Sequence, residues 1–165
     1  MQPYRTAMAS VAFALATSTA FAGAGHDGGH GGEHAAMMGQ PGNPAKADRI
    51  VEVSMTEMAF EPSNIQAMEG ETITFVVSND GEFVHEFNLG TEKMWQGHMD
   101  EMMKMMDTGM MTVDEVNHDK MMQAGMMHDD ANSVLLEPGQ TAKVTWTFGK
   151  KSEIGFACNV PGHRE

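Results

Sequence analysis

The sequence is poor in basic, aromatic and cysteine residues. Its 165 residues include 10 lysines and arginines against 23 aspartates and glutamates, a formal net charge of −13 at pH 7. A negative charge of this size repels phosphate, so binding to nucleic acid or to an anionic membrane is not expected. No apolar run reaches the ~18–20 residues that span a bilayer. The single cysteine excludes an intramolecular disulfide, and the length suits one domain with accessory segments.

The first 22 residues predict a secretory signal peptide. Arg5 precedes a short apolar run, residues 7–20, and the exit from that run, Ala20-Phe21-Ala22, is a small-residue cleavage site. We therefore expect cleavage after Ala22 and a mature protein in an oxidising compartment, most simply a bacterial periplasm. The alternative is a buried N-terminal helix, which the glycines and histidines that follow at once do not favour.

Residues 23–48 predict a disordered tail, because they are rich in glycine and contain Pro41 and Pro44. Three histidines in this tail are spaced by four residues, and two methionines follow them. Imidazoles bind Cu(II) well, whereas thioethers prefer Cu(I). We expect an accessory copper site here; the alternative is a polar tail whose histidines bind nothing. The histidines are His26, His30 and His34.

Residues 49–165 predict a strand-rich, all-β domain. Short runs of β-branched and apolar residues are separated by turn sequences such as Asn79-Asp80-Gly81 and Glu137-Pro138-Gly139. Many short strands with such turns are typical of an antiparallel sandwich. The six runs cover residues 50–53, 72–77, 83–89, 133–136, 143–148 and 154–157.

Residues 91–131 interrupt the strands and predict a helical insert. Gly109 lies where a first helix should end, and Thr112-Val113-Asp114-Glu115 has the pattern of a capping box that opens a second helix, ending near Gly125. Five methionines in and just after the first helix have the i, i+3, i+4, i+7 spacing of one helical face. They are Met99, Met102, Met103, Met106 and Met110.

The insert contains twelve methionines, too many for one helical face. Adjacent pairs point in different directions, so several thioethers should be exposed. We expect these sulfurs to collect Cu(I) with low affinity; the alternative is that methionine fills a core. The candidate Cu(I) ligands are Met102, Met103, Met105, Met106, Met110 and Met111.

The strongest chemical motif lies near the end of the sequence. Cys158 and His163 occupy the two ends of a short loop shaped by Pro161 and Gly162. With one distant histidine they form the His₂Cys set of a type 1 copper site, and His85, among apolar strand residues, is the best third ligand. Cys158 alone could be an inert buried residue or an intermolecular disulfide partner. Each histidine alone could be an ordinary core or solvated residue.

These motifs resemble those of cupredoxins over residues 49–90 and 132–165. The resemblance implies a Greek-key β-sandwich in which His85, Cys158 and His163 bind copper. With its His-rich N-terminus and Met-rich insert, the sequence is most similar to the periplasmic copper-resistance cupredoxins. Glu86 favours that branch, since plastocyanin-like carriers usually have asparagine there. The matching stretches are Phe60-Glu61-Pro62, Glu69-Gly70-Glu71-Thr72, Val77-Ser78-Asn79, His85-Glu86-Phe87 and Phe156-Ala157-Cys158 to Gly162-His163.

The end of the sequence departs from the cupredoxin pattern. Cupredoxins usually place an axial methionine and a last strand beyond the second loop histidine, whereas this sequence ends two residues after His163. We expect a domain that lacks its last strand, as a fragment would, because a sandwich without an edge partner leaves backbone groups unpaired. A three-coordinate site, or an axial ligand from elsewhere, are the alternatives.

The sequence therefore predicts a periplasmic, non-enzymatic cupredoxin that binds Cu(I) and Cu(II) and protects against copper. Its expected partners are copper ions and a redox or copper-trafficking protein. The alternative is a dedicated electron carrier for a redox enzyme, because a copper-bound thiolate permits one-electron exchange; the methionine-rich insert favours copper tolerance. An oxidase is not expected, because three of the eight histidines lie in the tail.

Overall fold

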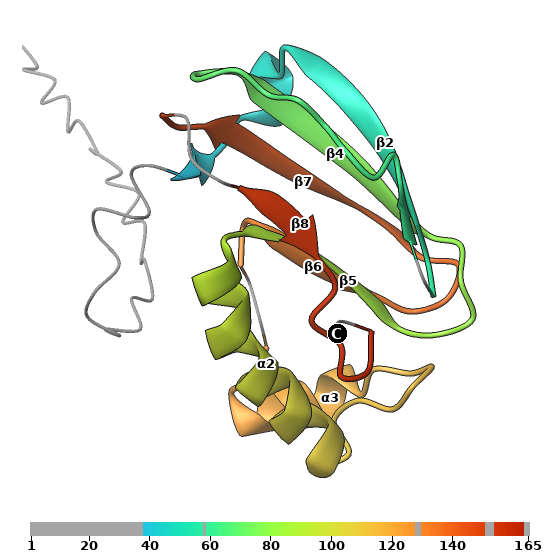
Figure 1. Cartoon of the computed structure of the whole chain (residues 1–165). Helices are drawn as coiled ribbons and strands as arrows, with labels where there is room; N and C mark the ends of the chain where they lie inside the picture. Colours follow the sequence, from blue (N-terminus) through green and yellow to red (C-terminus); the bar gives the residue numbers. More distant parts are fainter. Residues whose placement is uncertain (1–37, 58, 128–129, 151–153, 164–165) are drawn as a thin grey trace, which may run out of the picture.

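The computed structural model describes residues 38–57, 59–127, 130–150 and 154–163. The predicted signal peptide and the three tail histidines, His26, His30 and His34, lie outside these residues. The described part forms two β-sheets that face each other, with a helical segment beside the second sheet (Figure 1). This arrangement confirms the predicted β-sandwich with a helical insert. None of the described helices is long and apolar enough to cross a membrane.

The first sheet has the strand order β1-β7-β4-β2-β3. Strand β4 lies in its centre, where Ile73, Phe75 and Val77 alternate along the strand and are buried in the core. Strand β2 runs parallel to β4, with Val53 opposite Val77, so a purely antiparallel sandwich is a wrong prediction. Residues 57–71 connect the two strands and are long enough for the crossover that a parallel pair needs. The bounds are β1 Gly39–Pro41, β2 Arg49–Thr56, β3 Ala59–Glu61, β4 Thr72–Asn79 and β7 Thr141–Phe148.

The second sheet has the order β6-β5-β8, and both pairs are antiparallel. Strand β5 is buried along its whole length. Phe87 and Leu89 belong to the core between the sheets, whereas Glu86 contacts the helical insert. All six predicted strands are present in the two sheets; the short strands β1 and β3 were not predicted. The bounds are β5 His85–Gly90, β6 Ser133–Leu136 and β8 Gly155–Ala157.

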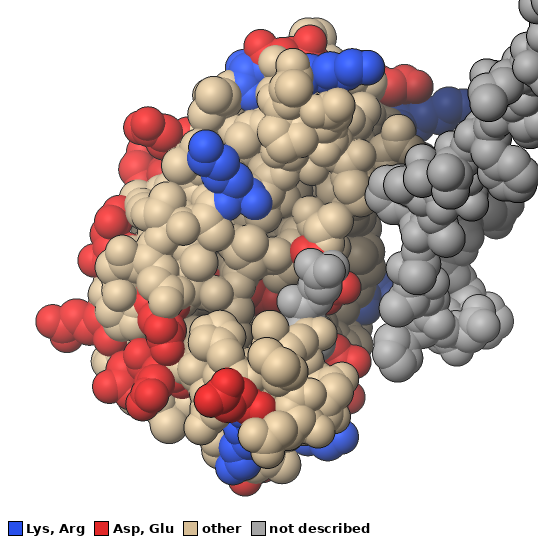
Figure 2. Space-filling view, turned by 180° about the vertical axis from the view of Figure 1, so that it is seen from behind, with Lys and Arg blue, Asp and Glu red and all other residues tan. Residues whose placement is uncertain are grey.

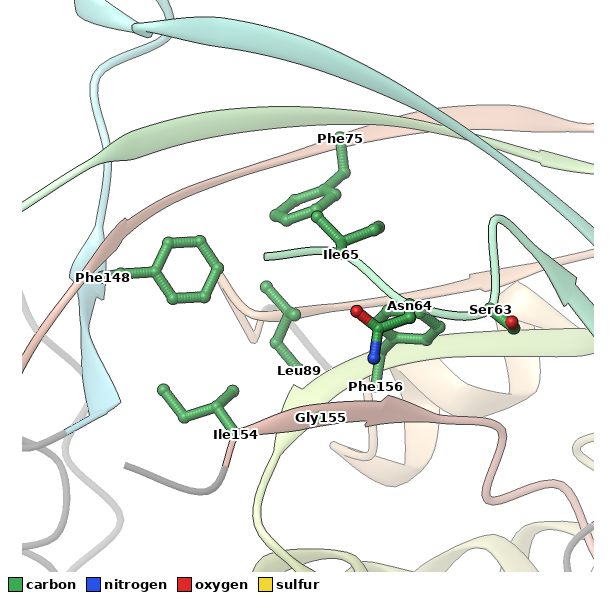
Figure 3. Close-up of a pocket in the computed structure, with 9 residues that line it drawn as sticks. All are labelled: Ser63, Asn64, Ile65, Phe75, Leu89, Phe148, Ile154, Gly155 and Phe156. Atoms are coloured by element: carbon green, nitrogen blue, oxygen red, sulfur yellow. The ribbon is translucent and has the colours of Figure 1, made fainter. Parts of the chain in front are cut away.

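The core between the sheets is built from aliphatic and aromatic side chains. Phe75 and Phe87 come from opposite sheets, and their ring centroids are 5.3 Å apart. At the end of β5 away from His85, a cavity of about 170 Å³ opens between the sheets (Figure 3). Its lining combines apolar side chains such as Leu89 and Phe148 with the polar Ser63 and Asn64.

Residues 38–48 are ordered, which corrects the prediction of a structureless tail through residue 48. Strand β1 pairs with β7, and a short 3₁₀ helix, η1 (Pro44–Lys46), follows it. Trp146 holds the start of this segment in place. Its indole N–H donates to the backbone oxygen of Met38, 3.1 Å away, and the Met38 side chain is buried. The glycines and prolines counted as disorder signals instead fit an edge strand and its turn.

The insert contains two helices, α2 (Glu92–Asp107) and α3 (His118–Ala124). Helix α2 ends before Gly109 and α3 ends before Gly125, as predicted. The prediction that α3 begins at Thr112 is wrong. Thr112 Oγ1 does accept from the Glu115 backbone N–H, but this bond closes a turn bracketed by the Met111–Val116 bridge. The helix begins instead after Asn117, whose side chain accepts from the backbone of the third residue on.

Candidate metal centre

The predicted copper ligands meet at one end of the second sheet. His85 opens β5, Cys158 directly follows β8, and His163 lies five residues further on. Cys158 Sγ is 3.8 Å from His85 Nδ1 and 3.6 Å from His163 Nδ1, and these two nitrogens are 3.2 Å apart. Antiparallel pairing of β5 with β8 produces this convergence from residues 73 positions apart.

The loop between Cys158 and His163 is held by its backbone. The His163 N–H donates to the Val160 carbonyl oxygen, 3.0 Å away, and closes a turn. Gly162 has a φ of 88°, a left-handed conformation that glycine adopts without strain. His85 and Cys158 are buried, whereas His163 is half-buried at the surface. The site is therefore closed on the β5 side and accessible on the loop side.

Burial sets the protonation states of these three side chains. It lowers the pKa values of His85 and His163, so both imidazoles are neutral near pH 7 and available as ligands. It raises the pKa of the Cys158 thiol to about 11, so the thiol keeps its proton in the absence of metal. A bound cation favours the thiolate instead, and metal binding therefore releases a proton.

The donor set fits copper. Two imidazole nitrogens and one thiolate are the trigonal ligands of a type 1 copper site. These three side chains are the group among the described residues that could hold a metal ion. His85 Nε2, on the far side of the ring, is buried without a hydrogen-bond partner and lies 3.9 Å from a carboxylate oxygen of Glu57. The ring is therefore oriented with Nδ1 toward the other two ligands.

The carboxylate of Glu86 lies beside the three predicted ligands and is almost completely buried. The backbone N–H of Glu86 donates to Cys158 Sγ at 3.3 Å, and one oxygen of the Glu86 carboxylate accepts from the side-chain amide of Asn159 at 2.7 Å. Burial favours the neutral acid, but hydrogen bonds from His98, Ser133 and Asn159 outweigh it and hold the pKa of Glu86 below its ordinary value. The sequence identifies Glu86 only as a glutamate where plastocyanin-like carriers usually have asparagine, and does not predict its contacts with Cys158 and Asn159.

The Met-rich insert packs directly against the metal centre. Cys158 and its neighbours Val84 and Val160 form a second core with methionines of the insert. Of the six candidate Cu(I) ligands, four are buried in this core, Met106 is half-buried against it, and Met103 is exposed. Copper binding by these six residues stays a prediction, and their burial favours packing for the four: Met102, Met105, Met110 and Met111.

Sequence reasoning missed His98, Asn159 and Glu57 as neighbours of the centre. The available signal was Glu86 itself, a charged residue inside the apolar run from residue 83 to 89. A carboxylate in a buried strand needs a cation or several donors close by. A histidine in the insert was a reasonable candidate, but three insert histidines compete and no spacing rule selects His98.

Comparison with known proteins agrees with this geometry. Residues 47–165 match the family of copper binding proteins of the plastocyanin/azurin type. The copper-resistant cuproprotein CopI of Pseudomonas aeruginosa is 43% identical over 79% of this chain and 78% of its own length. CopI of Rubrivivax gelatinosus is 39% identical over 98% of this chain and 90% of its own.

The fold is likewise that of a known cupredoxin structure. Auracyanin B superimposes with a TM-score of 0.53 at 15% identity, covering 76% of this chain and 88% of the auracyanin chain. At this identity the likeness shows the fold alone. The family match and the CopI relatives establish that this chain belongs to the plastocyanin/azurin family of copper-binding cupredoxins.

Proposed function

We propose that the protein is a periplasmic, non-enzymatic cupredoxin that protects the cell against copper. The carrying observation is the convergence of His85, Cys158 and His163 at a centre packed against a methionine core. When bound there, copper supplies one-electron exchange between Cu(I) and Cu(II). The chain provides two neutral imidazoles and a thiol that would release its proton to solvent when the metal binds. The relatives named copper-resistant support the cellular role.

Accessory copper collection is part of this proposal. The tail residues His26, His30 and His34 would capture Cu(II), and exposed methionines of the insert would capture Cu(I). Acidic side chains outnumber basic ones on the face shown in Figure 2, which supports attraction of cations. Transport to the periplasm would depend on the signal peptide ending at Ala22.

Replacement of Cys158 by serine tests the proposed site. The full mature chain loaded with copper should show a strong thiolate-to-copper charge-transfer band in the visible range, and Cys158→Ser should abolish it. His118→Ala, which removes an exposed histidine of the insert, is the matched control and should keep the band. A band that persists in Cys158→Ser would mean that this thiolate is not the copper ligand.

Growth on copper tests the cellular role. A strain without the gene should regain copper tolerance with the wild-type gene and with His118→Ala, but not with Cys158→Ser. Tolerance restored equally by Cys158→Ser would contradict the role of the centre.

Electron transfer to a redox enzyme is the second candidate function. His163 is half-buried at the surface, and its ring centroid lies 6.3 Å from that of Phe83, which is 39% exposed. A ligand histidine beside an exposed aromatic ring offers a partner protein direct access to the metal. Phe83→Glu should then slow electron exchange with a partner while leaving copper tolerance intact. Loss of tolerance in this variant would favour the carrier role as the basis of protection.

A further inference from the structure

Helix α2 of the insert is joined to the metal centre by a buried ion pair. His98 Nε2 lies 2.9 Å from Glu86 Oε1, and His98 Nδ1 lies 3.2 Å from an oxygen of Glu101. Both ring nitrogens face carboxylate oxygens, an arrangement that favours the doubly protonated imidazolium. The pKa of His98 is accordingly raised, chiefly by the hydrogen bond to Glu86. The side chains of His98 and Glu86 are only 13% and 3% exposed.

The second oxygen of Glu86 holds the ligand loop. Glu86 Oε2 accepts from the backbone N–H of Asn159 at 3.2 Å and from its side-chain amide at 2.7 Å. Asn159 directly follows the ligand Cys158, and the Glu86 backbone N–H donates to Cys158 Sγ. Glu86 therefore restrains the thiol ligand in two ways, at its sulfur and at the next peptide group.

Of the hydrogen bonds to the Glu86 carboxylate, the one from His98 carries the positive charge. Ser133 Oγ and the Asn88 side-chain amide also donate to Oε1, at 2.7 and 3.1 Å, but both are neutral. A buried carboxylate without a counter-charge is costly, and movement of the carboxylate toward water relieves that cost. Such a movement would take the acceptor Oε2 away from the Asn159 peptide.

We propose that His98 is a positioning residue for the copper centre: it provides the counter-charge that keeps Glu86 in place to hold Asn159 and Cys158. Helix α2 is then an outer part of the metal site as well as a carrier of methionines. The link to copper rests on the proposed function, whereas the restraint on Asn159 exists in the metal-free protein and is measurable there. The role of His98 at the copper centre and its restraint on Asn159 can therefore be disproved separately.

The metal-free protein provides the first test, by NMR hydrogen exchange at the Asn159 amide. Its N–H donates to Glu86, so its exchange reports directly on that carboxylate. His98→Ala should speed this exchange about tenfold or more, the effect of losing one charged hydrogen bond. His98→Gln keeps an N–H donor without the charge and should fall between wild type and His98→Ala. His118→Ala removes an exposed histidine of α3 and should match wild type.

Two results would overturn the proposal. One is an Asn159 exchange rate in His98→Ala equal to that of wild type. The other is an equal acceleration of amides in the distant strand β4, which would make His98 a general stabiliser. If His98→Ala does not fold, an Asn159 exchange rate in His98→Gln equal to that of wild type would overturn the proposal.

The copper-loaded protein provides the second test. Both His98 variants should shift the position or intensity of the thiolate-to-copper band, because the thiol ligand is less firmly held, and His118→Ala should not. An unshifted band together with faster Asn159 exchange would confine the role of His98 to the metal-free loop and overturn its role at the copper centre. Absence of a band in wild type would contradict the proposed function alone, and the exchange test would still stand.

Discussion

The molecule contains two hydrophobic cores of opposite character. The core between the sheets uses β-branched and aromatic residues such as Ile73, Val77 and Phe75, whose side chains have few rotamers and well-defined shapes. The core under the insert is built largely from methionine, around Cys158 and Val160. Methionine fills irregular gaps but loses more side-chain entropy on burial than isoleucine or leucine.

This difference has a consequence for stability. Stiff residues in paired strands give the sandwich a single arrangement, whereas the insert joins two helices and a turn around the metal ligands with adaptable side chains. We therefore expect the insert to open locally at a lower free energy than the sandwich. The predictions that follow begin with the largest expected effect.

Truncation of one buried residue in each core should separate the two regions. Phe75→Ala should lower the free energy of unfolding by about 3–5 kcal/mol, and Met105→Ala by about 2–5 kcal/mol. The distribution should differ: hydrogen exchange should accelerate throughout the protein in Phe75→Ala, but mainly in α2 and α3 in Met105→Ala. Met105→Leu, close in volume, is the control and should cost less than about 1.5 kcal/mol. Uniform acceleration in Met105→Ala would show that both cores open together.

The ion pair between the two regions should make stability depend on pH. His98 has a folded-state pKa raised above the ordinary 6.5, so its contribution is complete below pH 6.5 and is lost as the pH rises through the folded value. Glu86 has a lowered pKa, so its contribution is present above 4.5 and is lost at more acidic pH. Other charged or titratable groups on this side are Glu101, at the Nδ1 of His98, and Asp130 and His118, which line a cavity together with His98 and Glu86.

Denaturant unfolding of the metal-free protein measures this dependence. The stability difference between wild type and His98→Gln should be of order 1 kcal/mol near pH 6 and should shrink as the pH rises toward 9. His85 and His163 have lowered pKa values and act in the opposite direction, but they are present in both proteins and cancel. A difference that is constant from pH 6 to 9 would contradict a charged His98.

Helix capping in the insert should have a smaller effect. Asn117 caps α3 by accepting from the Lys120 backbone N–H at 2.9 Å, and Asn117→Ala should cost about 1 kcal/mol. Thr112, the cap that the sequence predicts, closes a turn instead, so Thr112→Ala should cost less and leave the helicity of α3 unchanged. Circular dichroism with unfolding of both variants checks this. A larger loss of stability and helicity in Thr112→Ala than in Asn117→Ala would show that Thr112, and not Asn117, caps α3.

The capping example shows what sequence reasoning could determine about the fold. Strand runs were predictable because alternation and turn residues are local, and Gly109 and Gly125 marked helix ends through their own conformations. Thr112 and Asn117 both carry side chains that can cap a helix. The choice between them depends on the burial of Met111 and Val116 in the second core, a tertiary effect that no local pattern contains.

The same reasoning applies to the metal centre. The convergence of His85, Cys158 and His163 could be predicted because the residue types are specific and the family resemblance supplied their order, whereas copper binding by these three side chains stays a prediction. Glu86 was visible only as an unusual residue. Its bond to His98 joins β5 to a helix in the insert, and neither residue predicts the other in sequence. The methionine-rich insert was correctly placed, but which sulfurs face solvent depends on how α2 packs.

The smallest effect on stability is expected from the exposed methionines. Four methionines of the insert are between 43% and 64% exposed: Met94, Met103, Met122 and Met127. Replacement of all four by leucine should change the free energy of unfolding by less than about 0.5 kcal/mol per site, because surface positions contribute little packing. If these methionines collect copper, Cu(I) uptake at acidic pH and growth on copper should both fall in the variant. Thioethers carry no proton and bind Cu(I) even at acidic pH, whereas imidazoles bind more weakly there.

The control replaces the buried Met102 and Met105 by leucine, which should cost stability but leave Cu(I) uptake unchanged, because their sulfurs do not reach solvent. Uptake that falls only in the control would assign Cu(I) to the buried core, and uptake that falls in neither would leave the methionines of the insert with packing as their role.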